Sequence, residues 1–155
     1  MKKIFLASDH AGIERKKEIT DWLKTQIQKN VFTQKFEIID LGPTDTQSVD
    51  YPDFANKVCT NIPSSTDETA VGILICGSGQ GMAMRANKFT HIRAALCWNV
   101  ESATLSREHN NANVLCFGAR MLTLEMSENS VSAFLQTSFA GGRHSLRVAK
   151  ISSPV

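Results

Sequence analysis

The sequence predicts an α/β protein in which a five-stranded parallel sheet carries helices on both faces. Short apolar segments alternate with longer segments whose apolar residues recur at helical spacing, which is typical of parallel strands joined by crossover helices. The apolar run over residues 71–75 is too short for a helix and lacks the alternation of a half-exposed strand. This run therefore indicates a central strand that is covered on both sides.

The elements follow one another in regular order along the chain. Strands are expected over residues 3–8, 36–41, 71–75, 93–97 and 114–117. Helices are expected over residues 13–29, 51–62, 82–88, 101–107 and 123–138. Residues 63–69 form a polar connector that is too short to separate domains. We therefore expect a Rossmann-like three-layer sandwich, with residues 1–155 as a single domain and residues 140–155 as its basic C-terminal tail.

A glycine-rich loop follows the third strand and reads Cys76-Gly77-Ser78-Gly79-Gln80-Gly81. Its alternating glycines can expose successive backbone N–H groups, which form a site for negative charge without any cationic side chain. The spacing fits neither the dinucleotide fingerprint nor a Walker loop. A thiol beside such amides has its thiolate stabilised, so Cys76 is a candidate nucleophile or general base. A tight turn that happens to follow an ordinary buried cysteine is the alternative.

Other polar residues also border the strands. Asp9 and His10 follow the first strand, Arg120 follows the fifth, and His109 and Asn110 precede the fifth. Ligands bind beyond the carboxyl ends of parallel strands, and we expect these residues to converge there. Each has a simpler interpretation, since Asp-His after a strand often caps a helix and Asn110 could belong to a turn.

The C-terminal tail is basic, with no acidic residue after Glu128. Arg143 and Arg147 are four residues apart, so in a helix they lie on the same side and could bind one phosphate together. A solvated basic tail is the alternative. The net charge of +2 is too small to indicate binding to nucleic acid or a membrane. The loop and the arginine pair together favour a small phosphorylated substrate.

Cysteine usage and the N-terminus indicate a cytoplasmic protein. Asp9 and His10 interrupt the first apolar segment long before it reaches the length of a signal peptide, and no segment is long enough to span a membrane. Four cysteines without an export signal are typical of a reducing compartment. No metal-ligand spacing occurs, so we expect no metal and no cofactor.

Several motifs resemble those of the B-type ribose-5-phosphate isomerases, a family that includes isomerases of galactose 6-phosphate and allose 6-phosphate. The resemblance runs from residue 3 to about residue 151. Its motifs are Ala7-Ser8-Asp9-His10-Ala11-Gly12, Asp50-Tyr51-Pro52, the loop 76–81, Ala86-Asn87-Lys88, Ser106-Arg107-Glu108-His109-Asn110, and Gly141-Gly142-Arg143-His144 with Arg147.

The resemblance implies an aldose-ketose isomerase of the pentose phosphate pathway, with a role for each motif. Cys76 would be the base that moves a proton between C2 and C1, and His109 would open the furanose ring. The sugar would be bound by Asp9, Tyr51, Gly77, Ser78, Gly79, Gln80, Gly81 and Asn110, and the phosphate by His10, Arg120, Arg143 and Arg147. Some relatives use a glutamate in the loop as base, but that position here is Gln80, which cannot act as one.

The family also implies a homodimer or a dimer of dimers, with active sites between subunits. The residues themselves agree with the chemistry, because an enediolate intermediate needs fixed hydrogen-bond donors more than it needs a metal. Two alternatives stay open. One is an isomerase of a six-carbon sugar phosphate, and the other is a nucleotide-binding module, which would not need Cys76 and His109 together.

Overall fold

Five parallel strands form a sheet with the order β2-β1-β3-β5-β4 in the computed structural model, which describes residues 1–65 and 68–153. The strands are β1 (Lys2–Ser8), β2 (Phe36–Asp40), β3 (Ala70–Cys76), β4 (Ala94–Leu96) and β5 (Val114–Gly118). The predicted fold class is thereby confirmed. Parts of the expected connector and of the expected tail, residues 66–67 and 154–155, lie outside the described residues.

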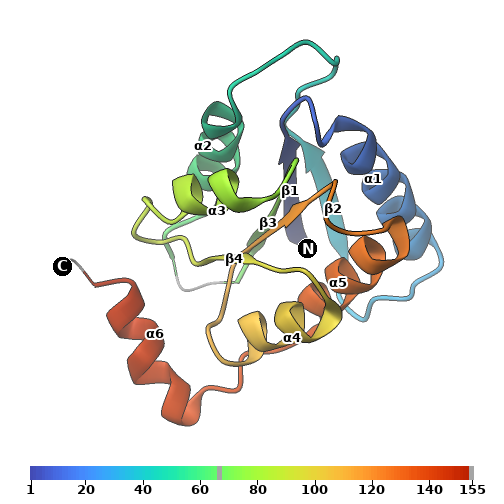
Figure 1. The fold of residues 1–155 in the computed structure, drawn as a ribbon. Coiled ribbons are helices and arrows are strands. Elements are labelled where there is room, and N and C mark those ends of the chain that lie inside the picture. The colour runs from blue at the N-terminus through green and yellow to red at the C-terminus, as the bar shows by residue number, and fades with distance from the viewer. Residues whose placement is uncertain (66–67, 154–155) are drawn as a thin grey trace.

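The helices cover both faces of the sheet (Figure 1). They are α1 (Ile13–Gln28), α2 (Tyr51–Asn61), α3 (Gln80–Ala86), α4 (Val100–Glu108), α5 (Leu124–Gln136) and α6 (Ser145–Ile151), and a 3₁₀ turn, η1 (Gly142–His144), precedes α6. Helices α2 and α3 pack on one face, and α1, α4 and α5 on the other. No helix in the described part of the chain has the length and apolar content that a bilayer span requires.

Strand β3 lies at the centre because both of its faces are apolar. Ile73 and Ile75 belong to the core under α1 and α5, whereas Leu74 and Cys76 belong to the core under α2 and α3. Each fully buried aliphatic side chain contributes roughly 1.5–3 kcal/mol to the free energy of unfolding. The centre of the sheet therefore fixes the position at which β3 ends.

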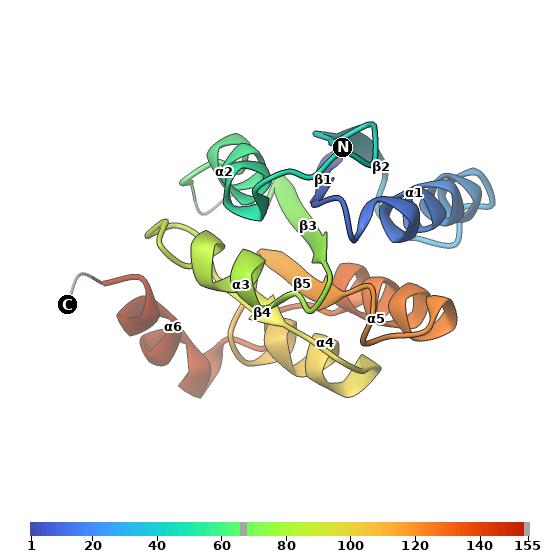
Figure 2. The same ribbon diagram turned by 45° about the horizontal axis from the view of Figure 1, so that its top comes forward.

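The edge strand β4 and the C-terminal tail differ most from the expected elements. Strand β4 spans three residues instead of five, since it pairs only with β5 and its side chains are half-buried. The tail beyond residue 141 is helical, and α6 stands away from the body of the protein in both views (Figures 1 and 2). No described residue of α6 is buried.

Candidate active site

The glycine loop holds the Cys76 thiol at the carboxyl edge of the sheet. Cys76 is the last residue of β3 and is 5% exposed, and the Gly79 amide donates a hydrogen bond to its Sγ at 3.0 Å. Gly79 has φ +81°, and a Cβ there would lie 2.7 Å from the Phe117 backbone. Only glycine fits at this position. The loop therefore directs an amide at the sulfur because it is pressed against β5.

Two further backbone donors of the loop have no partner among the described residues. The amide N–H groups of Ser78 and Gly81 donate no hydrogen bond to the described residues, whereas the Gln80 amide contacts the Ser78 hydroxyl at 3.4 Å. Ser78 and Gln80 are exposed. The loop thus presents donors beside a thiol, which is the arrangement that an oxyanion next to a reacting carbon needs.

Two side chains from other elements lie directly on this loop. A Cβ at Gly77 would lie 3.1 Å from Nη1 of Arg120, and a Cβ at Gly81 would lie 2.5 Å from Cζ of Tyr51. The Arg120 amide also donates to the Gly77 carbonyl at 3.1 Å. The predicted neighbourhood of Arg120, Tyr51 and the loop is therefore found, and it adds a cation and a phenol to the thiol edge.

Asp9 and His10 lie at the same edge, directly after β1. The Gly12 amide donates to Asp9 Oδ1 at 3.0 Å, so the carboxylate of this buried residue does serve the start of α1. The Val49 amide donates to Nδ1 of His10 at 3.3 Å, which leaves Nε2 as the ring nitrogen that carries a proton. His10 is exposed and can present this donor to a ligand.

His109 and Asn110 lie at the opposite edge of the sheet. Helix α4 runs back from the end of β4 to the start of β5, and Arg107 near its end bonds Glu68, which also pairs with Lys2 at the start of β1. Seven residues of β1 span about 20 Å between the two edges. The expectation that His109 and Asn110 join Cys76 within one chain is therefore wrong, because residues that precede a parallel strand lie at its amino end.

The tail joins His109 at that second edge. The Ala140 amide donates to the Glu108 carbonyl at 2.9 Å, and the rings of His109 and His144 stack with centroids 4.3 Å apart and planes at 10°. Arg143 and Arg147 are exposed beside this stack. The chain therefore divides the predicted residues into a thiol group at one edge and a cationic group at the other.

The sequence analysis assigned no role to His144, which contacts His109. Its pKa is lowered by desolvation and by the positive charges of His109, Arg143 and Arg147. His144 directly follows Arg143 in the motif Gly141-Gly142-Arg143-His144, and this position is the sequence signal for it. An imidazole in this position adjoins both the proposed ring-opening group and the proposed phosphate-binding groups.

The remaining thiols lie away from the loop amides. Burial raises the pKa of Cys59 to about 12 and also raises the pKa values of Cys97 and Cys116. These three side chains behave as small apolar groups. Within residues 1–65 and 68–153, no three His, Cys, Asp or Glu side chains are grouped as a metal site would need.

Known proteins resemble the chain over nearly its whole length. The family described as Ribose/Galactose Isomerase matches residues 4–151. A protein named ribose-5-phosphate isomerase B from Escherichia coli K12 is 41% identical over 153 residues, which cover 99% of this chain and 96% of that protein. A probable ribose-5-phosphate isomerase B from Mycoplasma pneumoniae is 43% identical over 149 residues, or 96% of this chain and 91% of its own length.

A solved structure shares the fold as well. The crystal structure of ribose-5-phosphate isomerase B from Mycoplasma genitalium, with bound ribulose-5-phosphate, matches with a TM-score of 0.87 and 42% identity, covering 97% of this chain and 93% of that one. Identity of this size over this length, together with the match of the family, establishes the relationship. The chain belongs to the ribose/galactose isomerase family.

Proposed function

We propose that this protein is a ribose-5-phosphate isomerase, which interconverts the aldose ribose 5-phosphate and the ketose ribulose 5-phosphate. The observation that carries the proposal is the Gly79 amide at 3.0 Å from Cys76 Sγ, in a loop where the Ser78 and Gly81 amides donate no hydrogen bond to the described residues. The names of the similar proteins from Escherichia coli and Mycoplasma genitalium support the same reaction and substrate. The four free cysteines agree with a reducing cytoplasm, where pentose phosphates are interconverted.

The thiolate of Cys76 removes the proton on C2 of the open-chain aldose. The electron pair of that C–H bond forms a C1–C2 double bond, and the carbonyl electrons move to O1, which gives the enediolate. The proton of the O2 hydroxyl passes to O1, directly or through solvent water, and the electrons left on O2 form the C2 carbonyl while C1 takes the proton back from the thiol. No atom is gained or lost. The free amides of Ser78 and Gly81 would stabilise the enediolate oxygens.

A second copy of the chain completes the site in this proposal. His109, Asn110, Arg143 and Arg147 lie at the sheet edge away from Cys76, so ring opening and phosphate binding would come from the partner subunit. Exposed apolar side chains support such a contact, because single chains rarely leave large groups of them in water. They are Met84 on α3, Trp98 and Val100 at the start of α4, Leu105 on α4, and Leu146 and Ile151 on α6.

Six-carbon sugar phosphates are the second candidate substrates, because the family also covers galactose isomerases. A parallel turnover assay with ribose 5-phosphate, allose 6-phosphate and galactose 6-phosphate tests the proposal. We expect kcat/KM to be highest for ribose 5-phosphate, and a preference for either hexose phosphate would reassign the substrate. Failure to turn over all three, with tight binding of a nucleotide instead, would remove the protein from the isomerases.

A further inference from the structure

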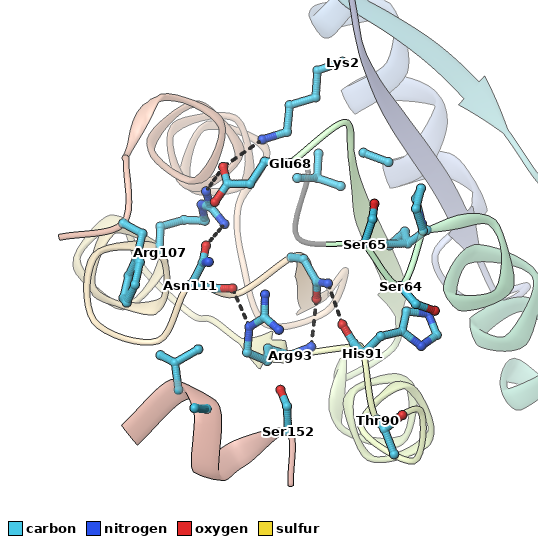
Figure 3. A pocket seen from close by; sticks show the side chains of 18 of the residues that line it. Lys2, Ser64, Ser65, Glu68, Thr90, His91, Arg93, Arg107, Asn111 and Ser152 are labelled. Carbon is cyan, nitrogen blue, oxygen red and sulfur yellow. Dashed lines mark hydrogen bonds and ion pairs between the residues drawn. The ribbon is translucent and has the colours of Figure 1, made fainter. Parts of the chain in front are cut away.

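A cavity of about 520 Å³ opens at the amino edge of the sheet, where the strands begin (Figure 3). Its walls come from the start of β1 and β3, from residues 90–93 before β4, from the segment after α4, and from α6. The thiol loop lies at the other end of the same strands. The cavity is therefore separate from the thiol edge of this chain.

Cations predominate among the charged side chains that line the described part of this cavity. Lys2 and Arg107 are 7% and 3% exposed, and both pair with the single carboxylate of Glu68, at 3.5 Å and 2.9 Å. Arg93 adds a third cation to the wall. Three positive charges thus face one negative charge in a partly buried space.

Arg93 has hydrogen-bonding capacity that the described chain does not use. Its Nε donates to the Asn111 carbonyl at 2.8 Å, but its two terminal NH₂ groups make no hydrogen bond to any described residue and point into the cavity (Figure 3). Burial and the charge of Arg107 lower the pKa of Arg93, and burial likewise lowers that of Lys2. Arg93 is half-buried and has no carboxylate partner among the described residues, so an anion in this part of the cavity would offset its charge.

The other polar groups around the cavity are mainly donors. The side-chain NH₂ group of Asn111 makes no hydrogen bond to the described residues, and Ser64, Ser65 and Ser152 present hydroxyl groups at the rim. We propose that this cavity is a second anion site of the protein, which binds a phosphoryl group at the terminal NH₂ groups of Arg93, with Lys2 and Arg107 adding positive charge to the same space. Ile62, Phe139 and Val148 add apolar side chains to the lining, so the cavity could also receive an uncharged body attached to that group.

Occupation of the cavity would also affect the tail. Ser145 and Ser152 at the two ends of α6 line the cavity, while Arg147 on the same helix is exposed and does not line it. An anion that bridges Arg93 to the Ser152 hydroxyl would hold the end of α6 against the body of the protein. Such an anion would therefore order the arginines that the proposed function assigns to substrate phosphate, but its binding does not require that assignment.

Binding of inorganic phosphate to an Arg143→Ala/Arg147→Ala variant tests the second site, because this variant removes the tail arginines that could bind phosphate elsewhere. The Arg93 Nε–H signal is followed by NMR at constant ionic strength, and titration calorimetry measures the affinity. We expect the Arg93 signal to shift with saturation, and Arg93→Gln in the same background to weaken phosphate binding by about tenfold or more. Lys17→Gln, which removes an exposed charge from α1, should leave the affinity within about twofold.

Two further variants and a second probe decide the outcome. Arg93→Lys keeps the charge and should retain part of the affinity, which separates loss of a ligand from loss of the fold. Glycerol 1-phosphate is the second probe. A higher affinity for it than for inorganic phosphate would identify a phosphate ester as the ligand of the cavity, and a lower affinity would identify free phosphate. An Arg93 signal that does not move with millimolar phosphate, or an Arg93→Gln variant with unchanged affinity, would overturn the proposal. Neither readout uses turnover, so the result is independent of the isomerase activity.

Discussion

The two edges of the sheet hold their polar groups in different ways. At the carboxyl edge, Cys76 and Asp9 are buried, and Gly79 and Gly81 leave no space for a Cβ. At the amino edge, Arg143 and Arg147 are exposed on a tail that stands away from the body (Figure 2). Proton transfer at carbon needs donors fixed within a fraction of an ångström, whereas capture of a phosphate tolerates mobile cations. The difference fits the proposed function, in which one chain supplies the proton-transfer groups and a second copy supplies the groups that bind phosphate.

Removal of the thiol should have the largest effect on activity. We expect Cys76→Ala to lower kcat by about 10²–10⁴-fold or more, the range that a general base supplies, with little change in binding of a phosphate-containing inhibitor. Cys59→Ala, which removes a buried thiol from α2, should keep most of the activity. Steady-state kinetics and inhibitor titration measure both. Full turnover by Cys76→Ala would show that the thiol edge is not where carbon chemistry occurs.

Subunit exchange tests whether the two edges belong to one site. Cys76→Ala and Arg143→Ala proteins are each expected to be poorly active. Random exchange of equal amounts places both defects in one site of each mixed dimer and neither in the other, so activity should return to about a quarter of the normal value. A mixture of Cys76→Ala and Cys76→Ser proteins is the control, because both carry the defect at the same residue and exchange between them should restore no activity. A mixture no more active than its parents, with exchange confirmed by mass, would return the tail to its own subunit.

The sequence predicted the thiol edge far better than the amino edge. Cys76, the loop glycines and Arg120 follow strands that are apolar and central, and parallel strands bring their carboxyl ends together. The prediction for His109 was wrong because this residue precedes β5 and α4 returns the chain to the amino edge. The contacts of Glu68 with Lys2 and Arg107 join residues 39 and more apart, and no local pattern reports such pairs. Long-range side-chain contacts therefore required the structure.

Loss of one tail arginine should weaken substrate binding by an intermediate amount. Arg147→Ala removes a charged contact to a dianion, which costs roughly 1.5–3 kcal/mol and raises KM about 10–150-fold with a smaller change in kcat. Lys150→Ala, which removes another exposed cation from α6, is the matched control and should change KM little. Ribose without phosphate should be equally poor for all three proteins. Equal KM values for the two variants would mean that Arg147 acts only through net charge.

Neutralisation of Glu68 should affect stability more than activity. Although burial opposes ionisation, Arg107 and Lys2 hold the pKa of Glu68 below its ordinary value of 4.5. Glu68→Gln should therefore lower the free energy of unfolding by about 1–2 kcal/mol at neutral pH, after allowance for solvent around a half-exposed carboxylate. Because the native pKa is depressed, this difference is present above pH 4.5 and is lost as the pH falls through the native value. Urea unfolding at several pH values measures it.

Glu37→Gln is the control for that change, since Glu37 is exposed on β2 and has no ion pair within the described residues. Its stability should differ little from that of the unmodified protein throughout the pH range. If Glu68→Gln and Glu37→Gln behave alike, the ion pairs with Lys2 and Arg107 do not stabilise the amino edge.

The smallest effect concerns the titration of His144, which reports on charge at the tail. Desolvation against His109, together with the charges of His109, Arg143 and Arg147, lowers the pKa of His144. Arg147→Ala removes one of these charges, so the pKa of His144 should rise toward its ordinary value. NMR titration of the His144 ring measures the shift, with Lys150→Ala as the control. Phosphate bound by the two arginines should raise the pKa of His144 in the same direction, because an anion offsets their repulsion. A pKa of His144 that is unchanged by both Arg147→Ala and phosphate would separate the histidine stack from the arginines and leave the amino edge without a common anion site.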